Sequence, residues 1–132
     1  MTRSLSYFSV FAFGIALSVL DQLLKHSLPS VQLNKGGVLG LALPGWVLII
    51  LHLTITCLVC LWVYVHRFAL VARLLTLVLV VAMSNLLDRI LWGQVVDYLQ
   101  IAGVWFNLAD VTIDVGMTWV AILLVKNKKW QN

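Results

Sequence analysis

All five acidic residues of this chain are aspartates, and each lies in or beside an apolar stretch: Asp21, Asp88, Asp97, Asp110 and Asp114. Ionisable residues at membrane depth are costly, so they indicate a functional site by default. Two aspartates that lie close together cannot both ionise, and they share one proton instead. One carboxylate of such a pair can take a proton from water while the other donates a hydrogen bond to a carbonyl. The pair then titrates as a unit.

The spacing of the polar residues suggests that some of these aspartates meet. Asn85 and Asp88 are three positions apart, as are Asn107 and Asp110, so each pair shares one face of a helix. Asparagine can orient a carboxylate without adding charge. We therefore expect one convergent site, built from four short polar segments at residues 21–25, 34–37, 85–97 and 106–110.

The elements that must position this site are membrane-spanning helices. The chain has 132 residues, of which 62% are hydrophobic and 11% charged, whereas soluble domains average about 45–50% apolar and about 25% charged. A spanning helix needs about 20 mostly apolar residues. We predict an all-α membrane protein, a single integral-membrane domain over 1–132, with four helices at about 5–24, 46–65, 68–87 and 107–125.

A small β-rich elaboration should stand on one side of the helices. Glycine and alternating apolar residues in Leu33–Leu43 and Val95–Phe106 predict short strands. Lysine and arginine near helix ends favour the cytoplasmic side. Six of the nine basic residues fall on one side and three on the other, which places both termini in the cytoplasm and the two longer loops outside. The positive charge therefore reflects topology, and no basic-aromatic stripe for nucleic acid is present.

Simpler structural roles compete for several of these residues. Asp88 and Arg89 could form an interfacial ion pair, and Asp21 and Lys25 a local pair at i and i+4. A lone histidine such as His52 more often lies satisfied in a core than binds a ligand.

Metal or redox chemistry has little support. Cys57 and Cys60 lie three apart in the second helix, a spacing that metal or redox chemistry also uses, but small packing residues of an apolar helix are the more common case. No His/Cys/Asp cluster has metal-ligand spacing, so we expect neither a metal nor another cofactor.

Four motifs together resemble one known family. They are Asp-Gln-x-x-Lys at 21–25, Asn-x-Gly-Gly at 34–37, Asn-x-x-Asp-Arg-x-x-x-Gly-x-Val-Val-Asp at 85–97, and Phe-Asn-x-Ala-Asp at 106–110. In this order the chain resembles the lipoprotein signal peptidases (signal peptidase II). The resemblance implies an aspartic endopeptidase of the bacterial inner membrane that removes the signal peptide of prolipoproteins before a diacylglyceryl-modified cysteine. It also implies inhibition by the cyclic peptide globomycin, with membrane lipid as a further partner.

Carried over by motif, the resemblance makes Asp97 and Asp110 the catalytic pair. The residues that would bind substrate and support the site are Asp21, Lys25, Asn34, Asn85, Asp88, Arg89 and Asn107. Asp114 is not explained by the family pattern. It lies four residues after Asp110 on the same predicted helix face, and we expect it to be neutral or bonded to Thr54, Thr56 or Ser84.

Two other function classes remain open at this point. Aspartates in helices also form the proton relays of transporters, although so short a chain with no inverted repeat argues against that class. A non-catalytic homologue that binds prolipoproteins without cutting them is the other alternative.

Overall fold

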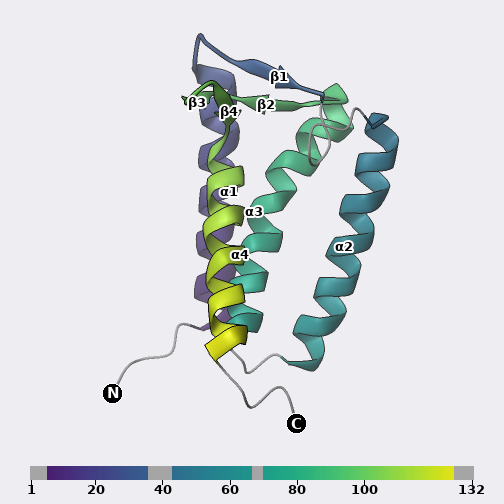
Figure 1. Cartoon of the computed structure of the whole chain (residues 1–132), viewed down its shortest axis with the longest axis vertical. Coiled ribbons are helices and arrows are strands. Elements are labelled where there is room, and N and C mark those ends of the chain that lie inside the picture. The colour runs from purple at the N-terminus through teal and green to yellow at the C-terminus, as the bar shows by residue number, and fades with distance from the viewer. Residues whose placement is uncertain (1–5, 36–42, 67–69, 127–132) are drawn as a thin grey trace.

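The computed structural model describes residues 6–35, 43–66 and 70–126, and Figure 1 shows their arrangement. The elements in chain order are α1 (Tyr7–Ser27), β1 (Gln32–Asn34), α2 (Gly45–Val65), α3 (Leu70–Trp92), β2 (Val95–Asp97), β3 (Leu99–Ile101), β4 (Val104–Phe106) and α4 (Leu108–Lys126). The strands lie together across one end of the helices, at the top of Figure 1. We call this end of the molecule the strand end.

All four helices are long and apolar enough to cross a membrane. They contain 19 to 23 residues, which at about 1.5 Å per residue matches a hydrocarbon core of about 30 Å. The predicted four-helix architecture is therefore confirmed. One boundary differs from the prediction: α3 continues to Trp92, five residues beyond the expected end at Leu87. The apolar run ends before the polar residues Asp88 and Arg89, but the helix continues through them.

The third helix is the centre of the bundle. Half of its most apolar window is buried inside the protein, against 11% or less for each of the other three helices. α3 packs against α1, α2 and α4, and α2 stands on the side of α3 away from the other two (Figure 1). A substitution on α3 therefore disturbs more packing than one on α2.

Two glycines let the outer helices approach α3 closely. A Cβ at Gly14 of α1 would lie 2.9 Å from Val80 Cγ1, and a Cβ at Gly116 of α4 would lie 2.5 Å from Val78 Cγ2. Valine is β-branched and stiff at χ1, so it cannot easily move aside. Small residues at such crossings are typical of helix packing in membranes, where close van der Waals contact supplies much of the association energy.

The strands form two small antiparallel sheets. β1 pairs with β2, with Gln32 opposite Asp97 and Asn34 opposite Val95, and β3 pairs with β4. A two-residue turn joins β3 to β4, and both of its residues have positive φ: 49° at Ala102 and 83° at Gly103. This backbone conformation matches the twist of a hairpin. The expected strands are present at 32–34 and within 95–106, whereas residues 36–42 of the first predicted segment lie outside the described residues.

Candidate active site

Asp97 is the last residue of β2 and is fully buried. Asn34 Nδ2, from the paired strand β1, donates to its Oδ2 at 3.0 Å, and Asn107 Nδ2 donates to its Oδ1 at 2.7 Å. Burial raises the pKa of the Asp97 carboxyl above its ordinary value. The two amide hydrogen bonds and the Lys25 charge oppose this rise, and the Asp88 charge adds to it. The net result is a carboxyl that is easier to protonate than an ordinary aspartate.

Asp110 lies in the first turn of α4 and is half-buried. Asn85 Nδ2, from α3, donates to its Oδ1 at 2.7 Å, and the backbone N–H of Asn107 donates to its Oδ2 at 3.3 Å. Asp110 therefore accepts two hydrogen bonds and is more exposed than Asp97.

Asn107 links the two carboxylates. Its side chain is fully buried, and its Nδ2 contacts both Asp97 Oδ1 at 2.7 Å and Asn85 Oδ1 at 3.0 Å. Its backbone N–H reaches Asp110, so a single residue contacts both aspartates. The negative charges of Asp97 and Asp110 interact with each other. Two interacting carboxylates bind one proton between them over a range of pH, and we call Asp97 and Asp110 the aspartate pair.

A buried ion cluster supports the site from the side of α1. Lys25 Nζ lies 2.7 Å from Asp21 Oδ2 and 2.8 Å from Asp88 Oδ2, and all three side chains are at most 1% exposed. The expected local pair of Asp21 and Lys25 is present, but it is only half of the cluster. The second oxygen of Asp21 accepts from Tyr98 Oη at 2.9 Å. The cluster thus ties α1 to α3 and to the residue that follows β2.

The predicted Asp88–Arg89 ion pair is wrong. Within the described residues, Asp88 pairs with Lys25 and also accepts from the backbone N–H of Val96 at 3.1 Å. Arg89 Nη1 instead donates to the backbone carbonyl of Asn85 at 3.4 Å. Neighbouring residues on a helix point in different directions. Asp88 therefore faces α1, whereas the half-buried Arg89 points elsewhere.

The structure therefore brings all nine predicted site residues to the strand end, in one network. Three further members were missed: Gln22, Ser84 and Tyr98. Tyr98 Oη accepts from the backbone N–H of Leu108 at 3.0 Å while donating to Asp21. Burial raises the pKa of the Tyr98 hydroxyl, so it remains a neutral donor. Its position next to Asp97 in the sequence could have indicated that Tyr98 belongs to the network.

Among the described residues Asp114 has none of the expected hydrogen bonds to Thr54, Thr56 or Ser84. Its side chain is exposed. The hydroxyl of Ser84 donates to Asp21, and that of Thr54 donates to its own helix at Ile50 O. The helical spacing placed Asp114 near the face of Asp110 but could not show which side of α4 the neighbouring helices cover.

The cysteines of α2 do not pack in the core, because both Cys57 and Cys60 are exposed and unpaired. Among the described residues no group of three or more His, Cys, Asp or Glu side chains has the arrangement of a metal site.

Comparisons with known proteins place this chain among similar sequences. The family model described as signal peptidase (SPase) II matches residues 11–126. A lipoprotein signal peptidase from Clostridioides difficile is 32% identical over 70% of this chain and 66% of its own length, just under two thirds. One from Allorhizobium ampelinum is 30% identical over 92% of this chain and 93% of its own length.

The fold itself is also found in solved structures. A bacterial membrane enzyme determined by the in meso method at 1.9 Å resolution has a TM-score of 0.75 at 19% identity, covering 91% of this chain and 94% of that one. A second bacterial membrane enzyme, determined at 2.3 Å, has a TM-score of 0.74 at 19% identity and covers 96% of this chain and 91% of its own. Four apolar helices, the network at the strand end and the match over residues 11–126 lead to one conclusion: this multi-pass membrane protein belongs to the signal peptidase II family.

Proposed function

We propose that the protein is an aspartic endopeptidase that removes the signal peptide from diacylglyceryl-modified prolipoproteins, with Asp97 and Asp110 as its catalytic residues. The observation that carries the proposal is that Asn107 contacts both carboxylates at one end of four spanning helices. Such a site suits a substrate whose signal helix and lipid chains remain in the bilayer while its scissile peptide bond reaches the membrane surface. The cut before the lipidated cysteine is part of this proposal and is carried over from the motif resemblance to the family.

The chemistry requires one proton on the aspartate pair. The ionised carboxylate takes a proton from water, and the oxygen of that water attacks the scissile carbonyl carbon. The protonated carboxylate donates to the carbonyl oxygen as negative charge develops on it. A proton then passes to the nitrogen of the leaving amine as the C–N bond breaks. The pair again holds one proton, so it is ready for the next substrate.

The side chains around the pair have distinct supporting roles in this scheme. Asn34 and Asn107 hold Asp97, and Asn85 holds Asp110. Asp21, Lys25 and Asp88 form the buried ion cluster that contacts Asn85 through Lys25. Arg89 is half-buried beside Asn85, where its guanidinium can donate to substrate carbonyls or lipid head groups.

A cleavage assay with a purified lipidated prolipoprotein tests the proposal. We expect the unaltered protein to release the signal peptide, and globomycin to stop the reaction. Asp97→Asn and Asp110→Asn should each reduce the rate by several orders of magnitude, since an amide can neither accept the proton of water nor share one. Retention of more than about a tenth of the activity in either folded variant would contradict the assignment. Binding without cleavage by the unaltered protein would instead identify a non-catalytic prolipoprotein-binding homologue.

The proposed orientation puts the strand end on the outer face of the bacterial inner membrane and both termini in the cytoplasm. The start of α1 and the end of α4 lie at the end of the bundle opposite the strands (Figure 1). The excess of basic residues near that end favours the cytoplasmic side. Single cysteines at positions 100 and 128, in a variant lacking Cys57 and Cys60, test this. Position 100 should react with an impermeant maleimide in intact cells. Labelling of position 128 under the same conditions would contradict the proposed orientation.

A further inference from the structure

Lys25 has a contact that its ion pairs do not explain. Its ammonium is fully buried and bonded to both Asp21 and Asp88, which is the pairing that a buried charge needs. In addition, Nζ donates to Asn85 Oδ1 at 2.9 Å and to Ser84 Oγ at 3.2 Å. Asn85 is the residue that bonds Asp110. Lys25 is therefore one side chain removed from the aspartate pair.

The contact with Lys25 decides which way the Asn85 amide points. Asn85 Oδ1 accepts from Lys25 Nζ and from Asn107 Nδ2, while Asn85 Nδ2 donates to Asp110 Oδ1 at 2.7 Å. A rotated amide would place its NH2 against two donors and its oxygen against a carboxylate. Only the observed orientation pairs donors with acceptors on every side.

We propose that Lys25 is a positioning residue for the aspartate pair: it holds the Asn85 carbonyl so that the amide N–H faces Asp110, and it sets a buried positive charge beside both carboxylates. This inference rests on the proposed function of the pair. It gives Lys25 a role in the site that differs from the structural role of the rest of the buried cluster, whose contacts join helices.

The positive charge of Lys25 should also affect the titration of Asp97, which the orientation of the Asn85 amide alone would not do. The charged groups that act on Asp97 from the elements around it are Lys25 of α1, Asp88 and Arg89 of α3, and Asp110 of α4. β1 contributes an uncharged amide, Asn34. Burial and the Asp88 charge raise the pKa of Asp97, and the Lys25 charge opposes them. Removing that charge should move the acid limb of the pH–activity profile to higher pH, because the ionised base forms only at higher pH.

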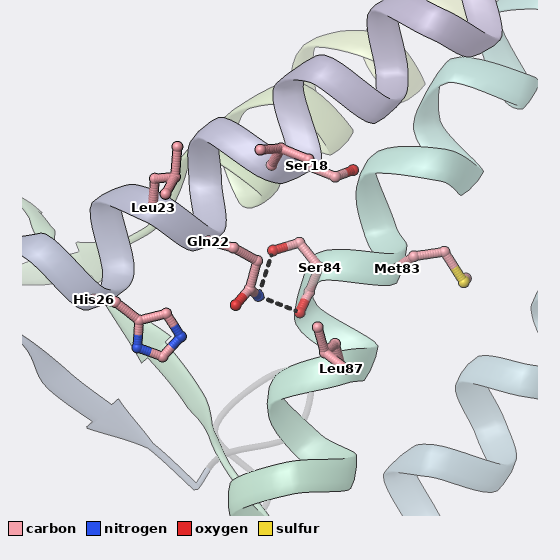
Figure 2. Close-up of a pocket in the computed structure, with 8 residues that line it drawn as sticks. Ser18, Gln22, Leu23, His26, Met83, Ser84 and Leu87 are labelled. Atoms are coloured by element: carbon pink, nitrogen blue, oxygen red, sulfur yellow. Dashed lines mark hydrogen bonds between the residues drawn. The ribbon is translucent and has the colours of Figure 1, made fainter.

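Ser18 provides a control on the same two helices. Its Oγ donates to Val80 O of α3 at 3.0 Å and to Gly14 O of α1 at 3.0 Å. Figure 2 shows Ser18 on α1 near Gln22, whose Nε2 donates to Ser84 O of α3 at 3.1 Å and to Ser84 Oγ at 2.9 Å. Ser18 thus shares with Lys25 the α1–α3 connection. Within the part of the chain that the structure describes, it has no hydrogen bond to Asn85, to Asp88 or to the aspartate pair.

The test compares Lys25→Met with Ser18→Ala, by steady-state cleavage of the lipidated substrate across pH and by thermal unfolding in micelles. Lys25→Met should lower kcat by about 10- to 100-fold, the scale of one lost charge-assisted hydrogen bond. KM should change little, and the acid limb should move to higher pH. Ser18→Ala should lower Tm while kcat and the acid limb stay unchanged. The inference is overturned if folded Lys25→Met has normal kcat and an unmoved acid limb, or if Ser18→Ala reproduces both changes.

Lys25→Gln keeps the test decisive if Lys25→Met does not fold. Glutamine retains a neutral donor for Asn85 but has no charge, so kcat should recover in part while the acid limb remains displaced. An unmoved acid limb in this variant contradicts the electrostatic role.

A readout independent of turnover separates this inference from the proposed function. The aspartate carboxyl carbons can be labelled with 13C and titrated by NMR in micelles. The Asp97 midpoint should rise in the Lys25 variants and stay in place in Ser18→Ala. If the unaltered protein cuts no prolipoprotein, the proposed function fails, but a displaced midpoint still supports the coupling and an unmoved one overturns it.

Discussion

Asn107 and Asp110 bond to each other twice at the start of α4. The Asp110 N–H donates to Asn107 Oδ1 at 2.8 Å, and the Asn107 N–H donates to Asp110 Oδ2 at 3.3 Å. This reciprocal arrangement is a capping box, which satisfies two backbone donors that a helix start leaves unpaired. One proposed catalytic carboxylate is therefore held by the same bonds that begin the helix. Its position depends on the backbone as well as on its neighbours.

Two variants of Asn107 should separate capping from positioning. Asn107→Ser keeps a good capping oxygen but loses the amide that contacts Asp97 and Asn85, whereas Asn107→Ala loses both functions. We expect Asn107→Ala to be less stable than Asn107→Ser by about 1 kcal/mol. Both should lower kcat by at least about tenfold, since each removes a hydrogen bond to a charged group. Thermal unfolding and cleavage kinetics check this, and equal stability of the two variants would show that the cap contributes little.

The raised pKa of Asp97 predicts the pH dependence of activity. Because burial favours the protonated form, the acid limb of kcat/KM should lie above the ordinary aspartate value of about 3.9. The interacting pair titrates together, so this limb belongs to both carboxylates. A cleavage profile from pH 3 to pH 8 in micelles measures it, and a midpoint at or below about 3.9 contradicts the raised pKa.

The same shift predicts how Asp97 affects stability. A carboxyl whose folded pKa is raised costs no stability below its unfolded pKa of about 3.9. The cost develops as the pH rises through the folded pKa and is complete above it. Asp97 should therefore make Tm fall as the pH increases through this window. Asp97→Asn, which cannot ionise, should lack that component when Tm is compared at the two ends of the window.

Arg89→Lys should affect ligand binding rather than the fold. Asp88 is already paired with Lys25, so losing the guanidinium breaks no ion pair with Asp88. Lysine keeps the positive charge but loses the planar fork of donors. We expect weaker globomycin binding, or a higher KM for the lipidated substrate, with Tm within about 1 °C of the unaltered protein. A lower Tm with unchanged inhibitor affinity would make Arg89 a structural residue.

Asp114→Ser should leave the pH–activity profile in place. The carboxyl is exposed, and among the described residues it has no hydrogen bond to the site. It lies about 6 Å further along the axis of α4 than Asp110. A serine at this position removes an ionisable group from a spanning helix, which should be neutral or favourable for stability in a membrane. Movement of the acid limb to lower pH in this variant would make Asp114 a third member of the titrating group.

Hydropathy determined the membrane architecture without help from tertiary structure, because a spanning segment must satisfy its own backbone and cover itself with apolar side chains. It failed where polar residues belong to a helix, as at Asp88 and Arg89 in the last turns of α3. The motifs likewise predicted which residues gather at the strand end, since each retained its short spacing on a helix or strand. Asn107 and Asp110 are bonded partners because they lie three apart at a helix start.

Contacts between distant segments were decided only in the folded chain. Asn34 reaches Asp97 because β1 pairs with β2, a strand more than sixty residues away, and no local pattern specifies that register. Asp88 binds Lys25 rather than its neighbour Arg89 because the packing of α1 on α3 buries Lys25 beside it. A buried ammonium such as that of Lys25 must be paired, whereas the half-buried Arg89 need not be. Sequence spacing gives the direction of a side chain on its own helix, but which helix meets that face depends on how the whole bundle packs.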